Sequence, residues 1–402
     1  MAINVIEGGV CAPIGFLRAD IYSGIAKNSD KKDLVLIYSK KLSNAAATYT
    51  ANRIKAAPIT VTRDNLSNGR AQAIICNSGN ANSCNKNGIE VAKETCALIA
   101  EELKIAKSNV IVASTGAIGK SMSIDPITAS ASALVSTLKD IDNKATIDAT
   151  IQNKDDNGFS VSFEIGGQIC RIGGTFCGSN MSESNNATRL VFITTDCDIS
   201  SELLSSALEE SVRKIFSMLS ISDECSTNDM IAIMANGMSK NPPIAKKGKA
   251  YSEFTAALNS VSLNLCKKIA ADSSGATKLI ACSVIGAKNN ACAKKVAKSV
   301  VSSSLVKCAM FSSLADWGRI ITAVGCTDTD ADVSKLDISF VSGKGEIPVC
   351  YSGVGVNFSE DFAKEILSED EVTIVLKLGD GCGSAVAYGC DLSYDFIKMN
   401  SI

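Results

Sequence analysis

The stretch Leu190-Val-Phe-Ile-Thr194 is a short apolar run rich in β-branched residues, and it predicts a strand buried on both faces. The preceding residues 178–186 are rich in Asn, Ser and Gly, which predicts a loop, and Ala187-Thr188 joins this loop to the strand. Further upstream, Gly166-Gly167 separates two short runs and predicts a hairpin turn. By itself the region predicts a surface loop that leads into a core strand.

Outward from this strand, the same kinds of pattern recur and indicate a mixed α/β fold. Short β-branched runs predict further strands at residues 34–38, 73–76, 110–113 and 372–376. Helical periodicity occurs at residues 90–103, 124–138, 201–219, 251–270 and 291–301. Strands interspersed with helices predict an α/β or α+β protein. The glycine-rich segment 379–383 lacks the Lys-Ser/Thr ending of a phosphate loop, so a structural turn is predicted there.

Size and charge exclude several classes of protein. The chain has 402 residues, and at roughly 150 residues per domain two or three lobes are expected. Its net charge of -2 gives no electrostatic reason to expect nucleic acid or an anionic membrane as a partner. No apolar run approaches the ~20 residues that span a bilayer. Residues 1–10 carry Glu7 and no basic cluster, so we expect no secretory signal and a cytoplasmic location.

Two residue counts restrict the chemistry. The chain has 16 Cys, but these are scattered singly and form no Cys-x-x-Cys pair, which predicts reduced thiols and no zinc site. It has no His, which excludes every catalytic triad that depends on histidine. A general base must therefore be a carboxylate, a lysine, a tyrosine, a cysteine or a free α-amine.

Ten short segments spread over the whole chain form a distinctive ordered set. They are Gly9-Val-Cys-Ala-Pro-Ile-Gly-Phe16, Lys32-Asp-Leu34, Ala51-Asn-Arg-Ile-Lys-Ala-Ala-Pro58, Asn77-Ser-Gly-Asn-Ala-Asn82, Ala113-Ser-Thr-Gly-Ala-Ile-Gly119, Ser226-Thr-Asn-Asp229, Ala235-Asn-Gly237, Gly275-Ala-Thr-Lys-Leu279, Asp316-Trp-Gly-Arg-Ile320 and Gly389-Cys-Asp-Leu-Ser-Tyr-Asp395. Each is weak alone, but together, and in this order, they are specific and resemble the ornithine acetyltransferase family, ArgJ.

The resemblance implies a mixed α/β sandwich of the ArgJ/DmpA-like type and a precursor that cuts itself between Ala187 and Thr188. Fragments 1–187 and 188–402 would then share one fold, with Thr188 as the nucleophile. The cut frees an α-amine with a pKa near ~8 on the nucleophile itself, and this amine serves as the base. The resemblance also implies that the side chain of Thr115 and the N–H of Gly116 stabilise the oxyanion.

The sequence departs from the family at the substrate-binding positions. Where the family has Lys-Gly-Ser-Gly-Met-Ile-Ala-Pro, this chain has Cys177-Gly-Ser-Asn-Met-Ser-Glu-Ser184, so a fixed positive charge is lost. The positions that bind substrate by resemblance are Ile151 (or Thr150, with a small gap), Cys177, Thr188, Ser274 and Asn400. Each lost charge-assisted contact costs roughly 1.5–3 kcal/mol. Lys154, Glu183 and Arg189 lie near these positions in sequence and are alternative sources of charge or solvated surface residues.

The implied activity is the transfer of acetyl from N-acetylornithine to glutamate, with ornithine as the product. Some family members also take acetyl from acetyl-CoA. No metal or bound cofactor is expected, and the implied assembly is a heterotetramer of two copies of each fragment. Two alternatives stay open: a non-catalytic relative with a binding or structural role, and an N-terminal-nucleophile hydrolase that uses water as the acceptor.

Overall fold

The computed structural model describes residues 2–26, 32–143, 157–177, 189–221, 224–273, 275–329 and 331–399. The chain forms two compact units, residues 1–213 with 224–265 and residues 214–223 with 266–402. The predicted cleavage point between residues 187 and 188 therefore falls inside the first unit and does not separate the two units.

The first unit is built on one mixed sheet with the strand order β1-β6-β7-β8-β10-β3-β4-β5, and β2 pairs with β3. Its strands are β1 (Asn4–Ile6), β2 (Phe16–Ile21), β3 (Leu34–Tyr49), β4 (Arg70–Asn77), β5 (Val110–Ser114), β6 (Phe159–Ile165), β7 (Gln168–Phe176), β8 (Leu190–Thr195) and β10 (Met230–Ala235). Its helices are α1 (Ala57–Asn65), α2 (Gly88–Leu103), α3 (Asp125–Asn143), α5 (Ser201–Lys214) and α6 (Lys249–Ala271), whose last residues enter the second unit.

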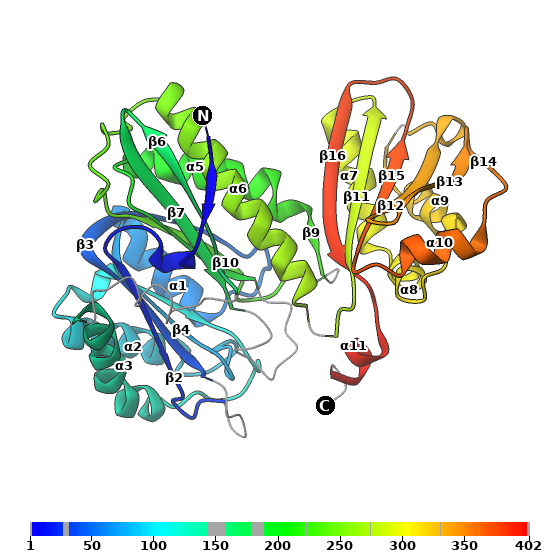
Figure 1. Ribbon diagram of the computed structural model, residues 1–402. Helices are drawn as coiled ribbons and strands as arrows, with labels where there is room; N and C mark the ends of the chain where they lie inside the picture. The colour runs from blue at the N-terminus through cyan, green and yellow to red at the C-terminus, as the bar shows by residue number, and fades with distance from the viewer. Residues whose placement is uncertain are drawn as a thin grey trace. The chain divides into compact units, whose positions relative to one another are not determined.

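The long strand β3 divides this sheet into two halves whose inner faces share a core. Residues 34–44 of β3 pair with β4, and residues 44–49 pair with β10. One face of β3, β4 and β5 packs against α2 and α3, which lie together on that side in Figure 1. The opposite face contributes Ile37, Ile74 and Ile111 to a core that also contains Phe192 of β8 and Met234 of β10. The first unit is thus a layered sandwich, and side chains on non-adjacent strands meet inside it.

The strand and helix patterns of the sequence predicted most of this unit. The hairpin is confirmed, because β6 and β7 pair with Ile165 opposite Gln168, and Gly166 and Gly167 both adopt positive φ angles, 58° and 83°. The predicted helix 201–219 is too long: α5 ends at Lys214. Residues Leu219–Ser220 form strand β9 instead, because they pair with β16 of the second unit.

The second unit has a seven-stranded sheet in the order β14-β13-β12-β15-β11-β16-β9. Its strands are β9 (Leu219–Ser220), β11 (Leu279–Ala287), β12 (Asp337–Ser342), β13 (Gly345–Tyr351), β14 (Val354–Gly355), β15 (Glu371–Lys377) and β16 (Gly383–Cys390). Its helices are α7 (Asn290–Ser302), α8 (Ser304–Phe311), α9 (Trp317–Gly325), α10 (Glu360–Leu367) and α11 (Tyr394–Met399). The predicted turn at 379–383 is confirmed: it connects β15 to β16, and its Gly381 N–H donates to the Gly286 carbonyl.

Candidate active site

A tight turn follows β5 at residues 114–116, where the sequence predicts the oxyanion donors. Strands β4 and β5 are parallel, so their carboxyl ends meet, with Asn77 opposite Ser114. The Asn77 carbonyl accepts the Thr115 N–H at 2.9 Å, and its side-chain Oδ1 accepts the Ser114 hydroxyl at 2.6 Å. All three residues are buried. The turn is therefore held at two points by one asparagine of the neighbouring strand.

Gly116 is required by its surroundings. Its φ angle is +135°, and a Cβ at this position would lie 2.3 Å from both the Asn80 nitrogen and the Gly79 carbonyl carbon. Real Cβ atoms do not approach backbone atoms so closely, and L side chains rarely adopt this backbone conformation. The close approach fixes the Thr115–Gly116 peptide against the loop that follows β4.

Asn228 joins this turn to the strand β10. Its side-chain amide donates to the Ser114 carbonyl at 2.8 Å and to the Ala81 carbonyl at 2.7 Å, and Asn228 is buried. The Thr227 hydroxyl donates to Asn228 Oδ1 at 2.6 Å, which fixes the orientation of the amide. Asn228 precedes β10 by two residues, so this side chain ties together segments that are more than 100 residues apart in sequence.

The neighbouring Asp229 fixes the first described residue after Thr188. The Arg189 N–H donates to Asp229 Oδ1 at 2.7 Å, and the Arg189 carbonyl accepts the Met230 N–H at 2.9 Å. Burial raises the pKa of the Asp229 carboxyl, and the hydrogen bond from Arg189 opposes that shift. Asn228 and Asp229, adjacent in sequence, therefore bind the 114–116 turn and the start of the β8 segment at one end of β10.

Cys177 lies at this same end of the sheet. Its N–H donates to the Leu190 carbonyl at 3.0 Å and thereby continues the antiparallel pairing of β7 with β8. Its thiol lies 3.4 Å from the thiol of Cys76, which is opposite Ala113 in the β4–β5 pair. The structure thus brings Cys177 close to the carboxyl end of β5, which carries Thr115 and Gly116. As a thiol, Cys177 supplies no fixed positive charge there.

The other predicted site residues lie outside the described residues. They are Ala187, Thr188, Ile151, Ser274 and Asn400, and the alternatives Thr150, Lys154 and Glu183 lie outside as well. Their roles stay predictions. The segments that flank 178–188 are described. The first ends at Cys177, whose N–H donates to the Leu190 carbonyl, and the second begins at Arg189, whose N–H donates to Asp229. Asn228 and Asp229 were missed as site residues from sequence, although both belong to the quoted segment Ser226-Thr-Asn-Asp229.

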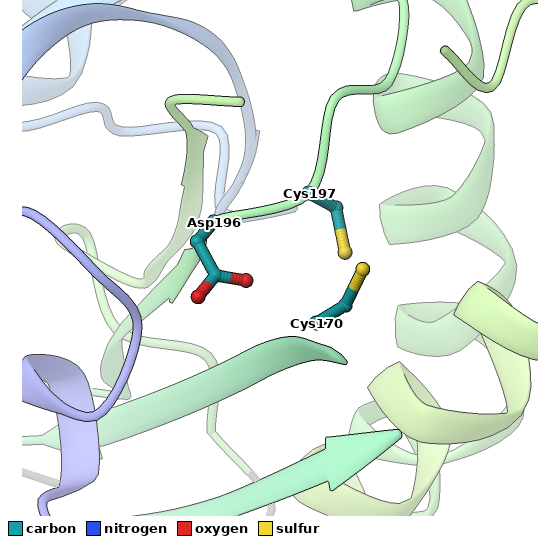
Figure 2. Close-up of side chains that lie close together, drawn as sticks. All are labelled: Cys170, Asp196 and Cys197. Atoms are coloured by element: carbon teal, nitrogen blue, oxygen red, sulfur yellow. The ribbon is translucent and has the colours of Figure 1, made fainter. Parts of the chain in front are cut away.

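A second cluster lies at the opposite ends of β7 and β8 and contains Cys170, Asp196 and Cys197 (Figure 2). One potential metal-ligand atom from each lies within 4.8 Å of the others, and all three residues are buried. However, Asp196 already accepts the Arg171 N–H at 2.7 Å, the Ile14 N–H at 3.1 Å and the Arg171 guanidinium at 3.3 Å. These bonds tie the amino-terminal segment to β7, and a guanidinium beside the carboxylate disfavours a further cation.

No helix among the described residues is both long enough and apolar enough to cross a membrane.

A layered α/β fold in which Asn228 binds the 114–116 turn and the adjacent Asp229 binds Arg189 fits the class predicted from sequence, an acyltransferase with an N-terminal nucleophile. The ArgJ family model matches residues 18–402, and the chain belongs to the ArgJ family.

Two relatives of known sequence match this chain over nearly its full length, and one solved structure matches about half of it. It is 39% identical over 403 residues to the arginine biosynthesis bifunctional protein ArgJ of Caldanaerobacter subterraneus subsp. tengcongensis, covering 99% of each chain. It is 41% identical to ArgJ 1 of Clostridium acetobutylicum, covering 99% of this chain and 98% of the relative. The crystal structure of ArgJ from Bacillus halodurans is 36% identical with a TM-score of 0.50, covering 52% of this chain and 97% of that one. The predicted family, enzyme class and fold class are confirmed.

Proposed function

We propose that this chain moves an acetyl group from N-acetylornithine to glutamate through an acetyl group carried on Thr188. The observation that carries the proposal is the pair Asn228 and Asp229. Asn228 binds the carbonyl of Ser114 in the turn, and Asp229 binds the N–H of Arg189, the residue covalently attached to Thr188. This anchoring supports the proposal, because Arg189 is only one residue, about 3.8 Å of chain, from the expected nucleophile.

The first step in the proposal is cleavage of the 187–188 bond, which gives Thr188 a free α-amine. This amine takes the proton of the Thr188 hydroxyl as the hydroxyl attacks the acetyl carbonyl. The oxyanion that forms is bound by Thr115 and by the N–H of Gly116, which the close approach of Gly79 holds in place. Ornithine leaves with its amine protonated, and the amine of glutamate then attacks the acetyl ester. The route needs no imidazole, as a chain without histidine demands.

Cleavage near the middle of the chain is supported by the length of the solved relative. Its chain, matched almost completely, corresponds to about half of this chain. The strands around the junction also suit a cut, because β7 precedes the junction, β8 follows it, and the two pair with each other. Acetyl-CoA as a second acetyl donor, a heterotetramer of two copies of each fragment and a cytoplasmic location complete the proposal, and no bound metal or cofactor takes part.

The substrate pocket is proposed to differ from the family pattern at Cys177. A thiol in place of a lysine leaves the substrate carboxylate without its charged partner, so weaker binding of glutamate and N-acetylornithine is expected. One lost charge-assisted contact corresponds to roughly 1.5–3 kcal/mol, or about a 10- to 150-fold rise in KM. Cys177→Lys is expected to lower KM by a comparable factor while kcat stays within a few-fold.

The test is the intact mass of the purified chain under denaturing conditions, followed by assays of acetyl transfer. Two fragments that meet at Ala187-Thr188, with Thr188→Ala uncut and Thr188→Ser cut, are expected. N-acetylglutamate should then form from N-acetylornithine and glutamate, and separately from acetyl-CoA and glutamate. A wild-type chain that stays whole would refute the mechanism and favour a non-catalytic role. Acetate release that is independent of glutamate would indicate a hydrolase instead.

A further inference from the structure

Two cysteines that are 101 residues apart in sequence place their sulfur atoms in contact. Cys76 Sγ in β4 lies 3.4 Å from Cys177 Sγ, just after β7. The strands β4 and β7 are not neighbours in the sheet, and the contact arises because the inner faces of the two half-sheets share one core. A disulfide requires about 2.05 Å between the sulfur atoms, so they would need to approach by about 1.4 Å.

The two thiols differ in accessibility. Cys76 is 1% exposed, whereas Cys177 is only partly buried and precedes the segment 178–188. The hydrogen bond to Cys177 and burial both raise the pKa of the Cys76 thiol well above its usual value, so Cys76 keeps its proton. A small oxidant can therefore reach Cys177 first, and the buried Cys76 lies in contact with it as the second thiol.

We propose that Cys76 and Cys177 form a two-cysteine oxidation site that takes a peroxide. After the Cys177 thiol gives up its proton, its sulfur attacks one oxygen of hydrogen peroxide and the O–O bond breaks. A sulfenic acid forms, and the released hydroxide takes up a proton as one water. The Cys76 sulfur then attacks the Cys177 sulfur, the S–O bond breaks, and the hydroxyl leaves with the Cys76 proton as a second water. The two thiols have lost two electrons and two hydrogen atoms, and the peroxide has become two waters.

The resulting disulfide would connect two parts of the candidate active site. Cys76 directly precedes Asn77, which holds the Ser114–Gly116 turn by its carbonyl and its side chain. Cys177 directly precedes the segment that contains the proposed cleavage point. Pulling the two sulfurs together by about 1.4 Å would shift the turn relative to Cys177, and a misplacement of about 1 Å costs roughly 100-fold in rate. This effect on activity rests on the proposed function, whereas the chemistry of the cysteines does not.

The cysteines Cys170 and Cys197 provide an internal comparison. They also come close together, with candidate ligand atoms within 4.8 Å, but both are fully buried, at 0% exposure. Because neither offers a route for the oxidant, this pair should stay reduced under conditions that oxidise Cys177. Cys326 provides the opposite control, since it is exposed.

The experiment is peptide mapping of the purified full chain after titration with hydrogen peroxide. Remaining thiols are blocked with N-ethylmaleimide under denaturing conditions before digestion. The expected product is a linked pair of peptides containing Cys76 and Cys177, lighter by two hydrogens and reversed by dithiothreitol, while Cys170 and Cys197 carry the maleimide. In Cys76→Ala the linked pair should vanish and Cys177 should proceed to sulfinic acid, because it lacks a second thiol.

Two results would overturn the proposal. The first is a sample in which Cys76 and Cys177 both carry the maleimide at a peroxide dose that oxidises Cys326. The second is a Cys177 linked to a different cysteine. Both results are read from the masses of the peptides, so this test does not depend on whether the chain transfers acetyl groups. If the proposed function also holds, the oxidised wild-type enzyme should lose roughly 100-fold in rate and recover with dithiothreitol.

Discussion

Asn228→Ala removes the side chain that binds the 114–116 turn, next to Asp229, which anchors Arg189. The amide of Asn228 is buried and donates to the carbonyls of Ser114 and Ala81. Leaving a buried acceptor without its donor costs about 1–3 kcal/mol, so the variant should lose about 2–6 kcal/mol of unfolding free energy. A domain of ordinary stability, about 5–15 kcal/mol, survives most of that range. Because the turn carries the proposed oxyanion donors and a misplacement of about 1 Å costs roughly 100-fold in rate, self-cleavage should slow by about 10²-fold.

The matched control is Asn241→Ala. Asn241 is equally buried, its Oδ1 accepts the Asp198 N–H at 2.7 Å, and its amide donates to the Pro242 carbonyl at 2.8 Å. It lies beyond the other end of β10, away from the turn. Urea unfolding should show a similar loss of stability in both variants, while a time course of intact mass should show slow cleavage in Asn228→Ala alone. Equal cleavage rates in the two variants would refute the positioning role of Asn228.

Three further predictions concern backbone geometry and titration. Gly116→Ala should prevent cleavage and lower the melting temperature. Gly119→Ala also introduces a side chain at a positive φ, +78°, but its Cβ meets nothing within 4 Å, so this variant should still cleave and lose less stability. Equal behaviour by intact mass and thermal melts would contradict the packing argument. Burial raises the pKa of Tyr49 to about 12 from 10.0, so the folded state keeps this proton to higher pH and the free energy of unfolding should fall as pH rises from 10 to 12. Tyr49→Phe should lessen that fall, as measured by urea unfolding at pH 9 and pH 11. An equal fall in the variant and the wild type would contradict this prediction. Gly275→Ala would place a Cβ 2.3 Å from the Phe396 nitrogen, so hydrogen exchange should quicken in α11, and unchanged exchange would show that the segment adapts.

The sequence predicted those parts of the fold that depend on local pattern. The β-branched runs became β4, β5, β8 and β15, and the Gly166-Gly167 pair became the turn of the β6–β7 hairpin. The helix predicted at 201–219 ended early because β9 forms only by pairing with β16, which is far away in sequence. No local sequence pattern predicts such a pairing.

The same distinction applies to the candidate site. Thr115 and Gly116 could be located because they stand in a short segment that resembles the family. The roles of Asn228 and Asp229 could not be predicted, because each depends on bonds to backbone groups that are distant in sequence. The contact between Cys76 and Cys177 was invisible for the same reason, since it exists only once the two half-sheets have packed together.

The pairing of β8 with β7 on one side and β10 on the other bears on the lifetime of the molecule. Once the bond before Thr188 is cut, as proposed, two polypeptides share this one sheet. The precursor reaches its structure as a single chain, at a rate independent of concentration. The cut protein, once unfolded, must instead reunite two separate chains, and recovery then depends on their concentration. Its half-life at high temperature would therefore depend on its rate of unfolding. A cell could replace an unfolded copy only by synthesising a new precursor.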